Sequence, residues 1–265
     1  MYSLRLTCPA EDVDRISGEL WEAGTIGIFE ADDSDGIVLT AGFETNELRT
    51  ALLAEFNTYT PRWQQEQAID WVHETHRAWP ARVIGDQLFL APPWSEEATP
   101  AGRKRVIHNP GLACGTGEHP CSQLALIALE RCVRNGCRVA DIGTGSAILT
   151  IAALKVGAES AIGIDTDEAA LAAARDNFEL NGLQPVLAAG SADCLADSSA
   201  DITVANINGT VLLHILDELV RIGRRGGWLI LTGFPESEAA VFTREFPNAE
   251  VSAIAEWRCL TVRIS

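Results

Sequence analysis

The sequence predicts an α/β protein built around a doubly wound parallel sheet. Beyond residue 100, short apolar runs alternate with longer segments in which apolar residues recur every three or four positions, the pattern of strands alternating with helices. Only a few residues join the last two of the seven expected strands, so the last strand must be antiparallel. Residues 1–60 follow a different order, which predicts a small separate domain in front of this sheet.

The composition narrows the possible functions. The chain has 265 residues and a net charge of -17, so it lacks the basic field of a nucleic-acid groove and favours a cationic partner. No apolar run reaches the ~18 residues of a membrane span, and the N-terminus has no signal pattern. The seven cysteines and five histidines show no metal-ligand spacing. We therefore expect a cytoplasmic monomer without a metal and without direct contact to nucleic acid or membrane.

The small N-terminal domain, residues 1–60, reads as a β-α-β-β-α unit of the ferredoxin-like α+β type. Its expected strands and helices are, in order, Tyr2 to Leu6, Pro9 to Ala23, Ile26 to Glu30, Gly36 to Phe43 and Thr45 to Phe56. Residues 61–100 then contain four of the seven tryptophans, and we interpret them as a structured linker. Within this linker we expect a helix over 69–79 and a strand pair over 82–91.

The main domain, residues 101–265, is predicted to hold the parallel sheet. Its expected strands are 138–142, 160–165, 185–189, 201–205, 228–231, 249–255 and 258–264. Its expected helices are 118–134, 147–156, 168–181, 210–222 and 236–245. A parallel sheet that ends in an antiparallel hairpin is the arrangement of class I methyltransferases.

The stretch from Val139 to Leu149 reads as a buried strand, a glycine turn and the start of a helix. Such a helix start exposes free backbone N–H groups, and glycines at 143 and 145 allow a ligand to approach the backbone closely. Asp141 would repel a phosphate but could accept a hydrogen bond from an ammonium or hydroxyl group. A dinucleotide fingerprint would need a third glycine where Ile148 stands. These features favour S-adenosylmethionine over NAD.

Four polar residues fall at or just beyond the ends of successive expected strands, where open α/β sheets bind ligands. They are Asp141, Asp165, Asp193 and Asn206. Asp165 could hold both ribose hydroxyls, and Asp193 could accept a hydrogen bond from an adenine amino group. With Gly143 and Gly145, these residues form the predicted cofactor pocket.

A second glycine cluster, Pro110-Gly-Leu-Ala-Cys-Gly-Thr-Gly-Glu-His-Pro120, precedes the helix that leads into the first strand. It could fold over the cofactor, which makes Thr116 and Gly117 candidate cofactor contacts. This segment resembles the P-G-L-A-F-G-T-G-x-H-P segment of the PrmA family, class I enzymes that methylate the eleventh protein of the large ribosomal subunit. Further similar segments are Asp70-Trp71, Pro92-Pro93-Trp94, Gly163-Ile164-Asp165, Arg175-Asp176-Asn177, Ala205-Asn206-Ile207 and Glu256-Trp257.

The resemblance implies that the two domains of the chain have different functions. Residues 1–60 would recognise a basic ribosomal protein, and the main domain would methylate its lysine ε-amines or N-terminal α-amine. Thr116 and Gly143 would touch the cofactor, Asp165 its ribose, and Asn206 would lie beside the methyl group and the incoming amine as the catalytic residue. Transfer from a sulfonium needs alignment and a neutral amine, and we see no residue that must act as a general base.

The chain departs from the family pattern at several positions. Cys114 replaces an aromatic residue, Cys121-Ser122 replaces two threonines, Ala147 replaces a glycine and Asn208 replaces a leucine. Two alternatives therefore remain open at the level of sequence. The acceptor could be another protein or a small molecule, or the chain could bind S-adenosylmethionine without catalysis.

Overall fold

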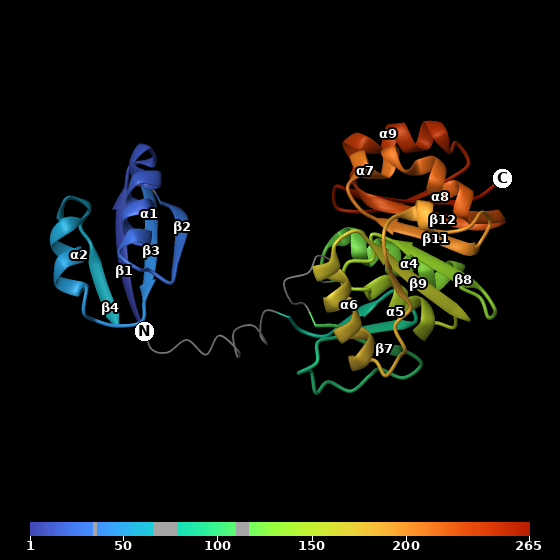
Figure 1. The fold of residues 1–265 in the computed structure, drawn as a ribbon, viewed down its shortest axis with the longest axis horizontal. Helices are drawn as coiled ribbons and strands as arrows, with labels where there is room; N and C mark the ends of the chain where they lie inside the picture. Colours follow the sequence, from blue (N-terminus) through green and yellow to red (C-terminus); the bar gives the residue numbers. More distant parts are fainter. Residues whose placement is uncertain (34–35, 66–78, 110–116) are drawn as a thin grey trace. The chain divides into compact units, whose positions relative to one another are not determined.

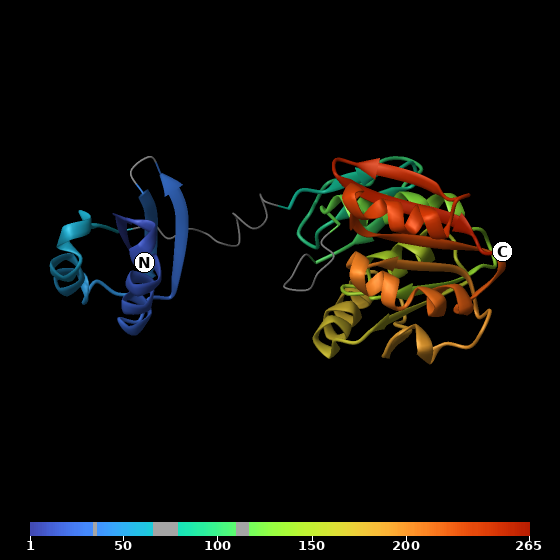
Figure 2. The same ribbon diagram turned by 90° about the horizontal axis from the view of Figure 1, so that it is seen from above.

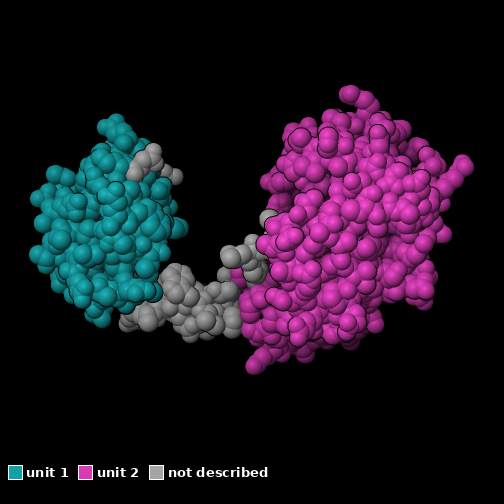
Figure 3. All heavy atoms as spheres, viewed as in Figure 1, with its two compact units in different colours: residues 1–75 teal, residues 76–265 magenta. Residues whose placement is uncertain are grey.

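The computed structural model describes residues 1–33, 36–65, 79–109 and 117–265. The chain divides into two compact units, an N-terminal unit of residues 1–75 and a C-terminal unit of residues 76–265 (Figures 1 and 3). In the described residues no helix combines the length and apolarity needed to cross a bilayer.

The N-terminal unit is an antiparallel sheet covered by two short helices, with the three strands and two helices that the sequence predicts and a fourth strand that it does not. Its strands follow the order β2-β3-β1-β4. They are β1 (Tyr2–Cys8), β2 (Gly27–Asp33), β3 (Gly36–Phe43) and β4 (Arg62–Gln65). The helices are α1 (Val13–Glu22) and α2 (Arg49–Glu55), with single 3-10 turns at Ala10–Asp12 and Asn57–Tyr59. Leu4 and Leu6 of the sheet pack against Ile16 and Leu20 of α1 in one buried cluster.

The strand β4 lies where the sequence analysis placed the linker. It pairs with β1 through Leu4 opposite Trp63, and the Trp63 ring stacks on Phe43 with ring centroids 5.2 Å apart. Three of its four residues are exposed, so the strand has almost no apolar alternation that a sequence pattern could detect.

The C-terminal unit holds the predicted seven-stranded sheet, in the order β10-β9-β8-β11-β12-β14-β13. Neighbouring strands are parallel from β10 to β12, and β14 alone runs against its neighbours. The strands are β8 (Arg138–Ile142), β9 (Ser160–Asp165), β10 (Leu187–Ala189), β11 (Ala200–Asn206), β12 (Gly223–Pro235), β13 (Glu250–Ile254) and β14 (Trp257–Arg263).

Helices cover both faces of this sheet (Figures 1 and 2). One buried cluster joins the sheet to α4 (Pro120–Cys132), α5 (Ile148–Lys155) and α6 (Glu168–Leu180). A second joins it to α7 (Gly209–His214), α8 (Leu216–Ile222) and α9 (Glu236–Glu245). The sequence predicted one helix over 210–222, but the helix is interrupted at Ile215, whose backbone is not helical, with φ -108° and ψ 14°.

The expected strand pair over 82–91 is present as β5 (Arg82–Ile84) and β6 (Leu88–Ala91). A third strand, β7 (Lys104–Ile107), adds to it in parallel. The helix expected over 69–79 falls almost wholly on residues 66–78, which lie outside the described residues.

Candidate active site

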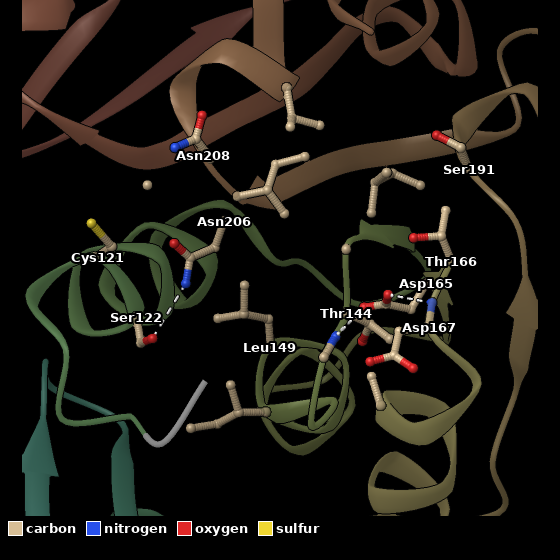
Figure 4. Close-up of a pocket in the computed structure, with 18 of the residues that line it drawn as sticks. Cys121, Ser122, Thr144, Leu149, Asp165, Thr166, Asp167, Ser191, Asn206 and Asn208 are labelled. Atoms are coloured by element: carbon tan, nitrogen blue, oxygen red, sulfur yellow. Dashed lines mark hydrogen bonds between the residues drawn. The ribbon is translucent and has the colours of Figure 1, made fainter. Parts of the chain in front are cut away.

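A pocket of about 950 Å³ opens at the carboxyl ends of the parallel strands, where the sequence places its candidate residues. Figure 4 shows polar side chains gathered at its two ends. We call one the carboxylate end, formed by Thr144, Asp165 and Asp167. We call the other the amide end, formed by Ser122, Asn206 and Asn208. Leu149 of α5 lies between the two ends.

The turn after β8 takes an unusual backbone path. Gly143, Gly145 and Ala147 have positive φ values of 73°, 53° and 63°. A Cβ atom at Gly143 would come within 2.3 Å of Ile207 Cγ2, so this position requires glycine for space as well as for conformation. At Ala147 a side chain occupies the left-handed region, which costs an L-residue about 1–2 kcal/mol.

The N–H groups of this turn donate within the protein, which corrects the expectation that they are free. Those of Gly143 and Thr144 donate to the Ile164 carbonyl at 2.8 and 2.9 Å. That of Gly145 donates to Asp165 Oδ2 at 2.8 Å. That of Ala147 donates to the Thr144 carbonyl at 2.8 Å. The turn therefore does not present these four donors to a phosphate group.

Asp141 lies beneath the turn, fully buried and outside the pocket lining. Its Oδ2 accepts hydrogen bonds from Thr144 Oγ1 at 2.8 Å, Thr150 Oγ1 at 2.6 Å and the Thr150 N–H at 3.1 Å. Its Oδ1 is buried without a hydrogen bond. Burial raises the pKa of this carboxyl group to about 6, with a smaller contribution from the Asp165 charge. Asp141 thus shapes the turn from below.

Asp165 ends β9 and lines the pocket, half-buried. Its Oδ2 accepts the Gly145 N–H, and its Oδ1 accepts the Asp167 N–H at 3.0 Å. Each carboxylate oxygen has a further acceptor position, so Asp165 can brace the turn and still bind two hydroxyl groups.

Asn206 ends β11 at the amide end of the pocket. Its Nδ2 donates to Ser122 Oγ at 3.2 Å, and Ser122 is itself buried on α4. This bond sets the orientation of the amide, which directs Oδ1 away from Ser122 (Figure 4). Asn208, two residues further on, caps α7 by accepting the Thr210 N–H on its Oδ1 at 2.8 Å.

An aromatic pair also lines the pocket. The His119 ring lies edge-on to the Trp257 ring, with centroids 4.5 Å apart. His119 Nδ1 accepts the Cys121 N–H at 3.2 Å and so caps α4. This bond engages the lone pair of Nδ1 in the helix cap.

The model of the family described as ribosomal protein L11 methyltransferase (PrmA) matches residues 1–265. The ribosomal protein L11 methyltransferase of Symbiobacterium thermophilum is 32% identical over 234 residues, which cover 88% of this chain and 74% of that protein. The enzyme of the same name from Streptococcus pneumoniae is 38% identical over 167 residues, which cover 62% of this chain and 52% of that protein.

A solved structure is similar to this chain and carries the same kind of name as these relatives. The ribosomal protein L11 methylase from Lactobacillus delbrueckii subsp. bulgaricus matches with a TM-score of 0.64 and 27% identity, covering 71% of this chain and 100% of that one. The chain belongs to the PrmA family. It is accordingly an S-adenosylmethionine-dependent methyltransferase.

The pocket of this PrmA-family chain fits that cofactor. Its lining within the described part of the chain contains no lysine or arginine, and two carboxylates, Asp165 and Asp167, lie on it. Such a lining disfavours a pyrophosphate and favours a cofactor with a positive charge and hydroxyl groups. Ala169, Ala170 and Ala173 of α6 give one wall a small, apolar surface. In the described residues no cluster of histidine, cysteine and acidic side chains could hold a metal ion.

The structure brings some of the predicted site residues together and separates others. Gly143, Gly145, Asp165 and Asn206 line one pocket. Asp193 is exposed and outside the lining, and Ser191 of the same loop lines the pocket instead. Gly117 also lies outside the lining, where a Cβ atom would come within 2.2 Å of Leu90 Cδ2. Thr116 falls outside the described residues.

The sequence analysis did not assign site roles to Ser122, His119, Trp257 or the threonines under the turn. Thr144 and Thr150 offered one signal, since hydroxyl residues that follow Asp141 by three and nine positions can reach it from a turn and a helix. Ser122 and Trp257 reach the pocket only through the tertiary fold, from α4 and from the strand next to β12.

Proposed function

We propose that this PrmA-family enzyme transfers methyl groups from S-adenosylmethionine to amino groups of ribosomal protein L11, namely lysine ε-amines and the N-terminal α-amine. The observation that carries the proposal is a single pocket with carboxylates at one end and an oriented amide, Asn206, at the other. The names of the relatives support the choice of acceptor. A ribosomal acceptor would place the reaction in the cytoplasm.

At the carboxylate end, the residues of this chain would hold the cofactor. Asp165 would accept hydrogen bonds from the two ribose hydroxyls while it keeps its bonds to Gly145 and Asp167. The glycine at 143 would let the cofactor lie against bare backbone. When bound, S-adenosylmethionine supplies a methyl group on a positively charged sulfur.

At the amide end, the residues would receive the amine. A lysine side chain has a pKa of about 10.4 and must lose a proton before its lone pair can attack. Asn206 Oδ1, directed by the bond from Nδ2 to Ser122, would accept an N–H of the incoming amine and so aim the lone pair along the line of transfer. The proton would leave to water, because the Nδ1 lone pair of the nearby His119 is engaged by the Cys121 N–H.

The N-terminal unit would recognise the acceptor protein. Residues 1–60 contain 12 acidic and 3 basic side chains, a balance that attracts a basic ribosomal protein. This unit also exposes large apolar side chains, with Trp21 at 55%, Ile26 at 50% and Phe29 at 70% exposure. Phe29 lies on β2, an edge strand of the sheet. Apolar anchors among acidic residues suit a basic protein surface.

The test is methyl transfer from isotope-labelled S-adenosylmethionine to purified L11, followed by mass spectrometry of its lysines and its N-terminus. We expect methylated amines in L11 with the wild-type chain and much slower labelling with Asn206→Ala. If the wild-type chain binds S-adenosylhomocysteine but leaves L11 unlabelled, the proposed acceptor is wrong. That outcome would favour a different acceptor or a chain without catalytic activity.

A further inference from the structure

The glycine turn of the pocket is held in its left-handed path by side chains from three different elements. From β8, Asp141 accepts the Thr144 hydroxyl. From β9, Asp165 accepts the Gly145 N–H. From α6, Asn177 Nδ2 donates to the Ser146 carbonyl at 3.0 Å. Each anchor thus acts on a different residue of the turn.

Asn177 differs from the other two anchors because it also holds a second segment. Its Oδ1 accepts the N–H of Asn109, two residues after the end of β7, at 2.9 Å. The two halves of one amide therefore bond two backbone segments, and a flip of this amide would break both bonds. Asn177 is 1% exposed, so no water replaces either partner at low cost.

A second asparagine, at the C-cap of the same helix, provides a natural control. Asn181, which directly follows α6, accepts the Ile107 N–H at 2.9 Å and donates to the Ile107 carbonyl at 2.6 Å. Asn181 has no hydrogen bond to the glycine turn in the described structure, and it is 9% exposed. Asn181 thus holds the last residue of β7 and Asn177 a residue two positions beyond it, and only Asn177 also bonds the turn.

We infer that Asn177 is a positioning residue for the cofactor. It fixes the Ser146 carbonyl, and with it the path of the turn between Gly145 and Ala147, against the backbone at Asn109. This inference rests on the proposed function, because it takes the turn to be a wall of the cofactor site. Asn177 itself lies outside the pocket lining, one helical turn beyond Ala173, which does line it.

The test compares Asn177→Ala with Asn181→Ala in the full chain, with S-adenosylhomocysteine as the probe in isothermal titration calorimetry. Loss of one buried hydrogen bond to the turn should raise the Kd of Asn177→Ala about tenfold, and that of Asn181→Ala by less than about twofold. In methyl-transfer assays the KM for S-adenosylmethionine should rise in parallel with the Kd. The kcat at saturating cofactor should stay within about twofold of wild type.

If Asn177→Ala does not fold, amide hydrogen exchange in the wild-type chain tests the inference instead. In amide hydrogen exchange, saturating S-adenosylhomocysteine should slow exchange at Gly145 and Asn109, which the Ser146–Asn177 bond connects. It should leave Ile107, held by Asn181, nearly unchanged. Equal slowing at Asn109 and Ile107 would overturn the inference.

Equal Kd values for the two variants would also overturn it, because both would then act only through general stability. A wild-type chain that binds no S-adenosylhomocysteine would overturn the proposed function and this inference with it. Binding by the wild-type chain with no difference between the variants would overturn the inference alone.

Discussion

The two ends of the pocket are built in opposite ways. At the carboxylate end, carboxylates hold the turn in place: Asp165 in the lining is bonded to two backbone N–H groups, and Asp141 is buried beneath the turn, outside the lining. At the amide end, neutral groups meet, with Asn206 bonded to Ser122. The difference suggests that the first end sets how tightly the cofactor binds and the second sets how fast the methyl group moves.

The largest expected effect is on rate at the amide end. Asn206→Ala should lower kcat about 100-fold, because the amine loses the group that aims its lone pair. The Kd for S-adenosylhomocysteine should stay within about threefold of wild type, since Asp165 is untouched. Stopped-time methylation assays measure kcat, and calorimetry measures the Kd. A large rise in the Kd would contradict the assignment of the amide end to the rate of transfer and not to cofactor binding.

Removing the Ser122 hydroxyl should affect the rate less than removing the Asn206 amide. Ser122→Ala should lower kcat about tenfold, because Asn206 loses the partner that fixes its amide orientation. Ser122→Thr keeps the hydroxyl group and should restore most of the rate. If both variants lose equal activity, packing on α4 and not the hydrogen bond is responsible.

At the carboxylate end, Asp165→Ala should weaken binding of S-adenosylhomocysteine by about 2 kcal/mol, or about 30-fold, through loss of charged hydrogen bonds. Calorimetry measures the change. Asp193→Ala is the matched control, since Asp193 is exposed and outside the lining, and its Kd should stay within about twofold. A larger effect at Asp193 than at Asp165 would reverse our assignment of the cofactor contacts.

The burial of the Asp141 carboxyl group makes the stability of the fold sensitive to pH. Its pKa of about 6 in the folded chain lies above the ordinary value, so the folded state favours the neutral form. Stability relative to Asp141→Asn should therefore be greatest below about pH 4 and fall by about 3 kcal/mol as pH rises to about 7. Urea unfolding of both proteins at several pH values measures this difference, which a flat result would contradict.

The smallest effect concerns the strained residue of the turn. Ala147→Gly should raise the free energy of unfolding by about 1 kcal/mol or less, because glycine adopts the left-handed conformation without steric conflict. Urea unfolding at neutral pH detects the change. A loss of stability would mean that packing of the fully buried Ala147 methyl group outweighs the strain.

Much of this architecture follows from the sequence. The strands that carry Asp141, Asp165 and Asn206 are short buried runs, and because helices separate them along the chain they are expected to be parallel, with their carboxyl ends at one edge of the sheet. What the sequence could not reveal depends on contacts between distant residues. The bond between Ser122 and Asn206 joins residues 84 positions apart.

The turn illustrates the same limit. Its glycines predict a close approach of ligand to backbone, but the Gly143 and Thr144 N–H groups bond the Ile164 carbonyl, which requires β9 to lie beside β8. Asp193 illustrates a related point. It follows the expected third strand in sequence, but in the structure Gly190 and Ser191 line the pocket, whereas Asp193 is exposed and outside the lining.

Single-turnover methyl transfer to L11, measured over a range of S-adenosylmethionine concentrations, tests the division between the two ends most directly. Asp165→Ala should reach the wild-type rate at about 30-fold higher cofactor concentration. Asn206→Ala should half-saturate at the wild-type concentration but with a rate about 100-fold lower. A reduced plateau for Asp165→Ala, or a large shift in half-saturation for Asn206→Ala, would contradict the account.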